Sequence, residues 1–153
     1  MKRLIVYFSR SGHNKKIAED LSKMLAADIE EIVDKKPKGF MMSGYQSMNK
    51  KITEIAKVKY RPSDYEQIIV VAPMWFGGIP PALRTYAEKF LSNINIALAS
   101  VSGNGFKNKH LVNDFARDFN LKISPLVMIS DTDLVKNNYQ EALEQFVKEC
   151  MAK

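Results

Sequence analysis

The chain has a single cysteine, Cys150, and no long run of apolar residues. One cysteine cannot form an internal disulfide framework, and this scarcity fits the reducing cytoplasm. The apolar stretch after Met1–Lys2–Arg3 ends at Phe8, which is too short for a signal peptide or a membrane span. We therefore expect a cytoplasmic protein with no membrane span, whose residues 1–153 form one domain with a sizeable core.

Several motifs that would indicate other functions are also missing. The sequence has neither the Gly-x-x-x-x-Gly-Lys-Ser/Thr loop of nucleoside triphosphatases nor the three-glycine dinucleotide fingerprint. The net charge is +6, and residues 35–61 hold eight basic side chains against one acidic side chain, Glu54. No nucleic-acid-binding motif accompanies this charge, so we interpret it as a solvated basic face and expect no nucleic acid partner.

Apolar runs alternate with helical patterns along the whole chain. The runs predict five strands, at residues 4–8, 28–33, 67–72, 94–100 and 123–129. The helical spacing of apolar side chains predicts five helices, at residues 14–27, 45–56, 82–91, 108–119 and 138–151. This alternation predicts an α/β fold, a doubly wound five-stranded parallel sheet with right-handed crossovers and helices on both faces. In such sheets, ligands bind outside the carboxyl ends of the strands.

The first loop at that edge, Ser9–Asn14, joins an apolar strand directly to a helix. Its sequence, Ser-Arg-Ser-Gly-His-Asn, places two hydroxyls and a glycine beside a helix N-terminus, where unpaired backbone N–H groups attract anions. These features indicate a pocket for the phosphate of a nucleotide or a flavin. An ordinary strand-to-helix turn, in which serine, glycine and asparagine are also common, is the alternative.

Two further loops lie at the same predicted edge. Pro73–Pro81 contains the only tryptophan of the chain, Trp75, beside Phe76 and two glycines. Such a side chain either packs in the core or forms a wall for a planar ligand, and its setting among glycine and proline favours the wall. Ser100–Gly105 supplies backbone amides that could contact the polar edge of a heterocycle, although Gly-Asn-Gly is also common in plain turns.

Together the three loops resemble those of the flavodoxin family, and the resemblance covers essentially the whole chain. It implies a flavodoxin-like sheet of strand order 2-1-3-4-5 and one non-covalent FMN, with no metal and no catalytic side chain. The FMN-binding residues that it implies come from all three loops: Ser9, Arg10, Ser11, Gly12, His13, Asn14, Lys15, Pro73, Met74, Trp75, Phe76, Gly77, Ser100, Val101, Ser102, Gly103, Asn104 and Gly105.

The sequence departs from the family pattern in three respects. His13–Asn14 stands where the phosphate loop more often ends in Asn–Thr, so we expect Asn14 to cap the helix, His13 to donate to the phosphate and Lys15 to offset the missing hydroxyl. The third loop has no aromatic residue for the outer flavin face, which leaves Phe40, Tyr45 or a partner to cover it. The chain is basic, whereas typical flavodoxins are acidic, so its expected redox partner is an acidic protein.

We expect an electron carrier, in which FMN performs the redox chemistry and the protein sets its orientation and electrostatics. One alternative is an NAD(P)H-dependent quinone reductase of the same fold, since an open flavin face would admit nicotinamide. The other is a flavin-free binding domain of doubly wound type. A receiver domain is disfavoured because the first strand ends without clustered acidic residues, and a phosphatase because the phosphate turn lacks cysteine. The chain is expected to be a monomer or a weak dimer.

Overall fold

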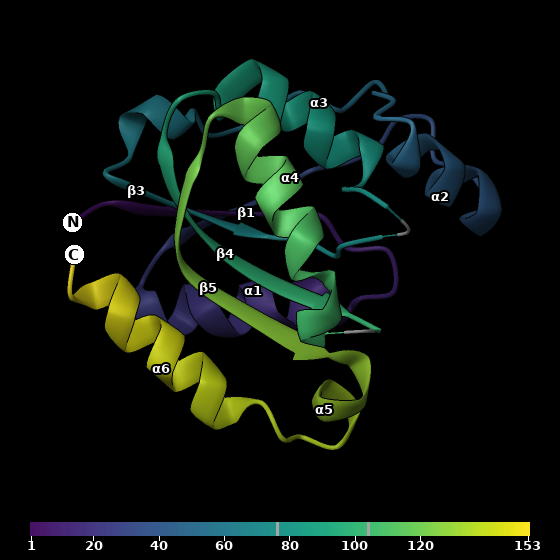
Figure 1. The fold of residues 1–153 in the computed structure, drawn as a ribbon. Coiled ribbons are helices and arrows are strands. Elements are labelled where there is room, and N and C mark those ends of the chain that lie inside the picture. The colour runs from purple at the N-terminus through teal and green to yellow at the C-terminus, as the bar shows by residue number, and fades with distance from the viewer. Residues whose placement is uncertain (76, 104) are drawn as a thin grey trace.

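The computed structural model describes residues 1–75, 77–103 and 105–153, and the side chains of all of these except Phe106 and Lys107. At its centre is one parallel sheet (Figure 1) of five strands: β1 (Arg3–Tyr7), β2 (Asp28–Glu31), β3 (Gln67–Val71), β4 (Asn95–Ser102) and β5 (Lys122–Ser130). Their order in the sheet is β2-β1-β3-β4-β5, which confirms the predicted fold class and strand order.

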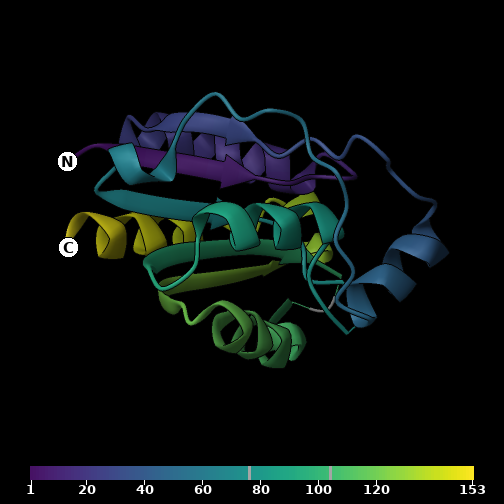
Figure 2. The ribbon, with the colours of Figure 1, turned by 90° about the horizontal axis from the view of Figure 1, so that it is seen from above.

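Helices cover both faces of this sheet (Figure 2). On one face lie α1 (His13–Leu25) and α6 (Gln140–Met151), and on the other lie α3 (Pro81–Phe90) and α4 (Lys109–Phe119). Along β1, Ile5 packs toward α1 and α6, whereas its neighbours Leu4 and Val6 pack toward α3 and α4. All three are fully buried, because a parallel strand between two helical layers has no side in water.

Two short helices lie at the carboxyl edge of the sheet, where the ligand loops are predicted. They are α2 (Phe40–Met48), which stands apart from the main body in Figures 1 and 2, and α5 (Asp131–Val135). Single 3₁₀ turns occur at Pro62–Asp64 and Gly105–Asn108. The first and last residues lie together at the opposite edge (Figure 1). None of the helices in the described part of the chain combines the length and hydropathy that a bilayer crossing requires.

The helix predicted at residues 45–56 is wrong in both position and extent. The helix at this place spans Phe40–Met48. Beyond it the chain returns beside the segment that follows β2, where Ile55 forms an isolated antiparallel bridge with Asp34. The helical spacing predicts that Ile52 and Ile55 share one face, but Ile52 is exposed, whereas Ile55 is buried in the core. The apolar spacing imitates a helical face, but backbone pairing to a distant segment decides the conformation.

Sequence reasoning missed α5 altogether. Its start is marked by Ser130, whose Oγ accepts a hydrogen bond from the Asp133 N–H at 3.0 Å. A serine followed three residues later by an acidic residue is a helix-start signal, but a helix of five residues is too short for an apolar repeat to reveal it. β4 also runs to Ser102 rather than ending at residue 100, so the third predicted loop begins inside the strand.

The helix α2 contacts the rest of the molecule through small side chains. Its buried residues are Ser43, Gly44 and Ser47, which allow a close approach to the turn at Gly78. A β-carbon built on Gly78 would overlap the carbonyl oxygen of Ser47. Glycine is therefore required at position 78 by the proximity of the α2 backbone.

We predict that Gly78→Ala lowers the free energy of unfolding by about 1–3 kcal/mol, because the added methyl group must displace the backbone of α2. Gly39→Ala is the matched control, since a β-carbon on Gly39, immediately before α2, would meet nothing within 4 Å. Urea unfolding followed by circular dichroism measures both variants. A Gly78→Ala protein as stable as the Gly39→Ala protein would contradict the tight contact described here.

Candidate functional site

The loops after β1, β3 and β4 meet at the carboxyl edge of the sheet and border a cleft of about 920 Å³. The cleft lies where the strand order reverses, between β1 and β3, which is the expected ligand position in a doubly wound sheet. Its volume is within the usual range for a small-molecule or cofactor site. The three loops that the sequence singles out are therefore brought together in space.

Ten of the predicted binding residues line this cleft: Arg10, Ser11, Asn14, Pro73, Met74, Trp75, Gly77, Val101, Ser102 and Gly103. Six others lie outside its lining: Ser9, Gly12, His13, Lys15, Ser100 and Gly105. Phe76 and Asn104 lie outside the described residues. The lining also includes Asn108, Leu111 and Asp131, which sequence reasoning missed because no recognisable ligand-binding motif surrounds the start of α4 or α5.

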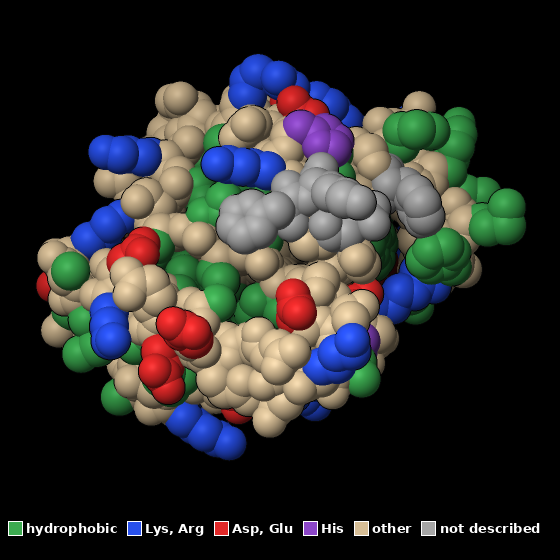
Figure 3. Space-filling view, turned by 60° about the horizontal axis from the view of Figure 1, so that its bottom comes forward, with side chains coloured by type: hydrophobic (Ala, Val, Ile, Leu, Met, Phe, Trp, Pro, Cys, Tyr) green, Lys and Arg blue, Asp and Glu red, His purple; other side chains and the backbone are tan. Residues whose placement is uncertain are grey.

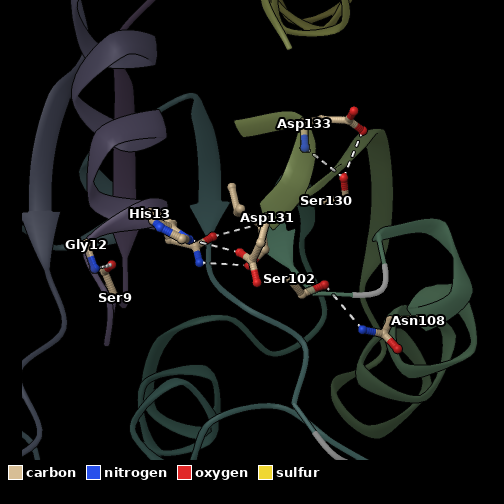
Figure 4. A network of polar contacts seen from close by, with 10 residues as sticks. Ser9, Gly12, His13, Ser102, Asn108, Ser130, Asp131 and Asp133 are labelled. Carbon is tan, nitrogen blue, oxygen red and sulfur yellow. Dashed lines mark hydrogen bonds and ion pairs between the residues drawn. The ribbon is translucent and has the colours of Figure 1, made fainter. Parts of the chain in front are cut away.

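The loop after β1 leads into a helix whose N-terminus is open. Gly12 has a φ of 91°, and its N–H donates to Ser9 Oγ at 3.1 Å, which closes the turn (Figure 4). Among the described residues, no side chain caps α1. The N–H groups of its first turn therefore lack acceptors within the helix, and the helix dipole adds positive potential there. Ser11 adds a hydroxyl to this side of the cleft.

Asn14 does not cap α1, so that prediction is wrong. It is buried as the second residue of the helix, and its side chain pairs with Val101 at the end of β4. Asn14 Nδ2 donates to the Val101 carbonyl at 3.0 Å, and Asn14 Oδ1 accepts from the Val101 N–H at 2.9 Å. A side-chain amide has one donor edge and one acceptor edge, so it matches a peptide group. The pair fixes the first loop to the third.

His13 contacts an acidic residue that sequence reasoning did not place at the site. Its Nδ1 lies 2.9 Å from Asp131 Oδ1, and Figure 4 shows the two side chains facing each other. Because a carboxylate oxygen accepts hydrogen bonds, Nδ1 carries the hydrogen of this contact. The imidazole thus engages the first residue of α5, and its other nitrogen, Nε2, accepts hydrogen bonds in the neutral ring and donates only in the imidazolium form.

One wall of the cleft combines a cation with two aromatic rings. The guanidinium of Arg10 lies 5.7 Å from the ring centre of Trp75 and 5.8 Å from that of Phe40, both within the range of cation–π attraction. Arg10 also donates hydrogen bonds to Ser43 Oγ at 2.9 Å and to the Lys38 carbonyl at 3.1 Å. The first loop is therefore tied to α2 as well as to β4.

Trp75 is half-buried, with an apolar neighbour behind it and the cleft in front. Its ring packs edge-on against Phe8, with ring centres 5.6 Å apart and planes at 77°. Its backbone forms two hydrogen bonds with Gly78, at 2.9 and 3.0 Å, which hold the loop after β3 in a tight turn. Of the two aromatic residues predicted to cover a ligand, Phe40 lines the cleft, whereas Tyr45 is exposed outside its lining.

Another wall of the cleft is formed by the end of β4 and the start of α4. Ser102 Oγ accepts a hydrogen bond from Asn108 Nδ2 at 3.2 Å, visible in Figure 4. Ser100 is fully buried, and its Oγ finds no hydrogen-bond partner among the described residues. Gly105 has a φ of 49° in the turn that leads to α4. This wall is polar but holds no lysine or arginine in the described lining.

The described lining contains few groups for acid–base or metal chemistry. Arg10, His110 and Asp131 are its titratable residues, and the described chain has no cluster of three or more histidine, cysteine or acidic side chains. Cys150 is packed in the core between α6 and the sheet, where burial raises the pKa of its thiol to about 11. A thiol that stays protonated at neutral pH is inert.

We predict that Asn14→Ala lowers the free energy of unfolding by about 2–3 kcal/mol, because it leaves the buried N–H and carbonyl of Val101 without partners. Asn108→Ala is the matched control, since it removes one hydrogen bond at a half-buried position and should cost less than about 1 kcal/mol. Urea denaturation monitored by fluorescence gives both values. Equal losses of unfolding free energy in the two variants would mean that the Asn14–Val101 pair stabilises the protein no more than the single Asn108 hydrogen bond does.

A sequence model of the flavodoxin family matches residues 2–149. A comparison with curated proteins found no match. Among solved structures, this chain is similar to a flavoprotein from Lactobacillus acidophilus NCFM, determined in complex with FMN. The identity is 20%, the TM-score is 0.68, and the similarity covers 89% of this chain and 97% of that one.

Two further structures are similar over nearly their whole length. A proposed flavoprotein from Bacteroides uniformis ATCC 8492 is 17% identical, with a TM-score of 0.70 and coverage of 96% of this chain and 97% of that one. Oxidised flavodoxin 2 from Bacillus cereus is 14% identical, with a TM-score of 0.56 and coverage of 95% and 99%. At these identities the structural likeness shows the fold alone. The family model, which spans residues 2–149, shows that this chain belongs to the flavodoxin family.

Proposed function

We propose that this chain binds FMN non-covalently and acts as an electron carrier between redox proteins. The observation that carries the proposal is that one cleft contains both an open helix N-terminus and an aromatic wall. The helix N-terminus is suited to a phosphate, and the aromatic wall is suited to a planar ring. Membership of the flavodoxin family supports the same ligand, as does the similar flavoprotein that was solved with FMN.

The first turn of α1 fits the phosphate end of FMN. A β-carbon built on Gly12 would meet nothing within 4 Å, so open space lies beside the backbone amides of this turn. A phosphate seated there would accept hydrogen bonds from those amides and from the Ser11 hydroxyl, and the helix dipole would favour its charge. Ser9 acts indirectly, because its hydroxyl already accepts the Gly12 N–H and holds the turn in shape.

The aromatic wall fits the ring end of the same ligand. Trp75 and Phe40 offer apolar surfaces, and a ring system of similar size would gain both burial and stacking against them. Bound FMN would supply electron-transfer chemistry that the side chains of the cleft do not provide. Arg10 places a positive charge at this wall, where it would favour a ring that has gained electrons.

The charge of the cleft favours a carrier over a nicotinamide-dependent reductase. A reductase must also hold the phosphates of NAD(P)H, for which arginine and lysine are the usual ligands. Arg10 is the single arginine or lysine in the described lining, and it is already bonded to Ser43 and to the Lys38 carbonyl. Several exposed lysines lie instead on either side of α2 in the sequence, among them Lys35, Lys36, Lys38, Lys50 and Lys51.

We predict that FMN binds far more tightly than riboflavin, and that Ser11→Ala weakens FMN about tenfold to a hundredfold while riboflavin affinity barely changes. The reason is the loss of one hydrogen bond to a charged phosphate, about 1.5–3 kcal/mol. Titration of the apoprotein, followed by quenching of flavin fluorescence, measures both ligands. Ser63→Ala, at an exposed serine outside the cleft lining, is the control. Equal affinity for the two flavins would remove the phosphate assignment.

For the holoprotein, we predict that NADPH is oxidised in the presence of menadione no faster than by free FMN at the same concentration. Dithionite should nevertheless reduce the protein fully, and ferricyanide should reoxidise it, because a carrier accepts and returns electrons. Absorbance at 340 nm and in the flavin bands follows these reactions. Saturable NADPH oxidation well above the free FMN rate would identify a reductase instead.

A further inference from the structure

The helix α2 exposes its apolar side chains and buries its small and polar ones, which reverses the pattern of an ordinary surface helix. Its apolar side chains, between 50% and 87% exposed, form what we term the α2 knob: Phe40, Met41, Met42, Tyr45 and Met48. Figure 3 shows apolar side chains gathered at its right, over α2. The small residues Ser43, Gly44 and Ser47 face the body and allow the tight contact with Gly78.

The composition of the α2 knob is typical of a surface that binds another protein. Five of the eleven exposed large hydrophobic side chains in the described chain lie on these nine residues. Contiguous apolar patches on soluble proteins mark interaction sites. Methionine and aromatic residues are enriched in protein interfaces, and the flexible methionine side chain adapts to the shape of a partner.

The charges around the α2 knob indicate the kind of partner. Five exposed lysines flank it on both sides in the sequence: Lys35, Lys36, Lys38, Lys50 and Lys51. Glu54 pairs with the first two, at 2.7 and 3.5 Å, Asp118 pairs with Lys50 at 2.9 Å, and Asp34 accepts from the Lys36 N–H, so five positive charges stand against three negative ones. A second copy of this chain would bring lysine against lysine, whereas an acidic partner would be attracted.

A membrane fits this helix less well than a protein does. Helices that lie in a bilayer surface carry a charged face opposite the apolar one. The nine residues of α2 contain no charged side chain, and their polar face is buried against the protein. The knob is thus a protrusion rimmed by charge, which matches an apolar hollow with an acidic rim.

The α2 knob also adjoins the cleft. Phe40 lines the cleft, and a β-carbon on Gly77, another lining residue, would lie 3.2 Å from Met48 Cγ. Arg10 bridges the two by contacting Phe40, Trp75 and Ser43. We propose that the α2 knob and its lysines form the docking surface for an acidic redox protein, which would approach the bound cofactor there. This inference rests on the proposed electron-carrier function.

The experiment compares two paired substitutions in the FMN-loaded protein. Met41→Gln with Met42→Gln changes the knob, and Met24→Gln with Met151→Gln changes two exposed methionines on α1 and α6. The acidic probe is a plant-type [2Fe–2S] ferredoxin, and the basic probe is cytochrome c. Calorimetry gives the dissociation constant of each oxidised pair. Stopped-flow absorbance gives the rate at which reduced ferredoxin loses one electron to each oxidised holoprotein molecule.

The unchanged protein should bind ferredoxin better than cytochrome c, with an affinity that falls as salt rises. The knob variant should bind ferredoxin at least tenfold more weakly and accept its electron at least tenfold more slowly. The control variant should match the unchanged protein, and all three should share the same circular dichroism spectrum, FMN affinity and dithionite reduction.

Two results would overturn the docking proposal while leaving the electron-carrier function intact. One is a holoprotein that binds ferredoxin no better than cytochrome c, and the other is equal behaviour of the knob and control variants. Dimerisation in sedimentation, or binding to phosphatidylserine vesicles, that the knob substitutions abolish without affecting ferredoxin would assign the surface to a second copy or to a membrane. Failure to bind FMN at all would overturn the electron-carrier function, and the docking proposal with it.

Discussion

The paired hydrogen bonds between the Asn14 side chain and the Val101 peptide group hold the ligand edge of this molecule together. β1 and β4 are not neighbours, because β3 lies between them, so strand pairing alone does not fix the loop after β1 against the end of β4. The amide makes this connection across 87 positions of the sequence. It is buried, so water does not compete for its bonds. The loop after β1 and the polar wall at the end of β4 are thereby held in a fixed relation.

Arg10 extends the same arrangement to the other side of the cleft. Only four residues before Asn14, it bonds to α2 while its guanidinium lies beside Trp75. The loop after β1 therefore contacts the segments that follow β2 and β3 and the end of β4. Each contact uses a different chemistry, namely hydrogen bonds to a hydroxyl and a carbonyl, cation–π attraction, and a buried amide pair. A short loop can organise a large site because Arg10, His13 and Asn14 each have a separate distant partner.

The core and the position of the site could be read from the sequence because both depend on strong, repeated signals. The buried runs at Leu4–Tyr7 and Ile68–Ala72 allow few structures other than central strands, and loops after parallel strands must share one edge. The role of Asn14 could not be read in this way. An asparagine near a helix start normally caps it, and the competing partner, Val101, is identified only by the fold.

The other differences each have an identifiable physical cause. Ile52 and Ile55 share a helical spacing, yet the bridge from Ile55 to Asp34 determines the chain path there. The predicted position of α2 is wrong because the inward face of this helix is made of serine and glycine, so the usual link between apolar residues and the core is inverted. Asp131 belongs to a helix of five residues, which is too short for an apolar repeat to reveal it in the sequence. Local sequence patterns do not predict the conformation where backbone groups form hydrogen bonds with a distant segment.

The placement of the two chain ends has a practical consequence for how this molecule can be tethered. Met1 and Lys153 lie together at the amino edge of the sheet, where the Met1 amino group is 3.7 Å from Glu66 Oε2. The cleft and α2 occupy the carboxyl edge. A fusion partner, a resin or an electrode joined to either end would therefore attach at the edge of the sheet opposite the cleft. The cleft and α2 would then face the solution.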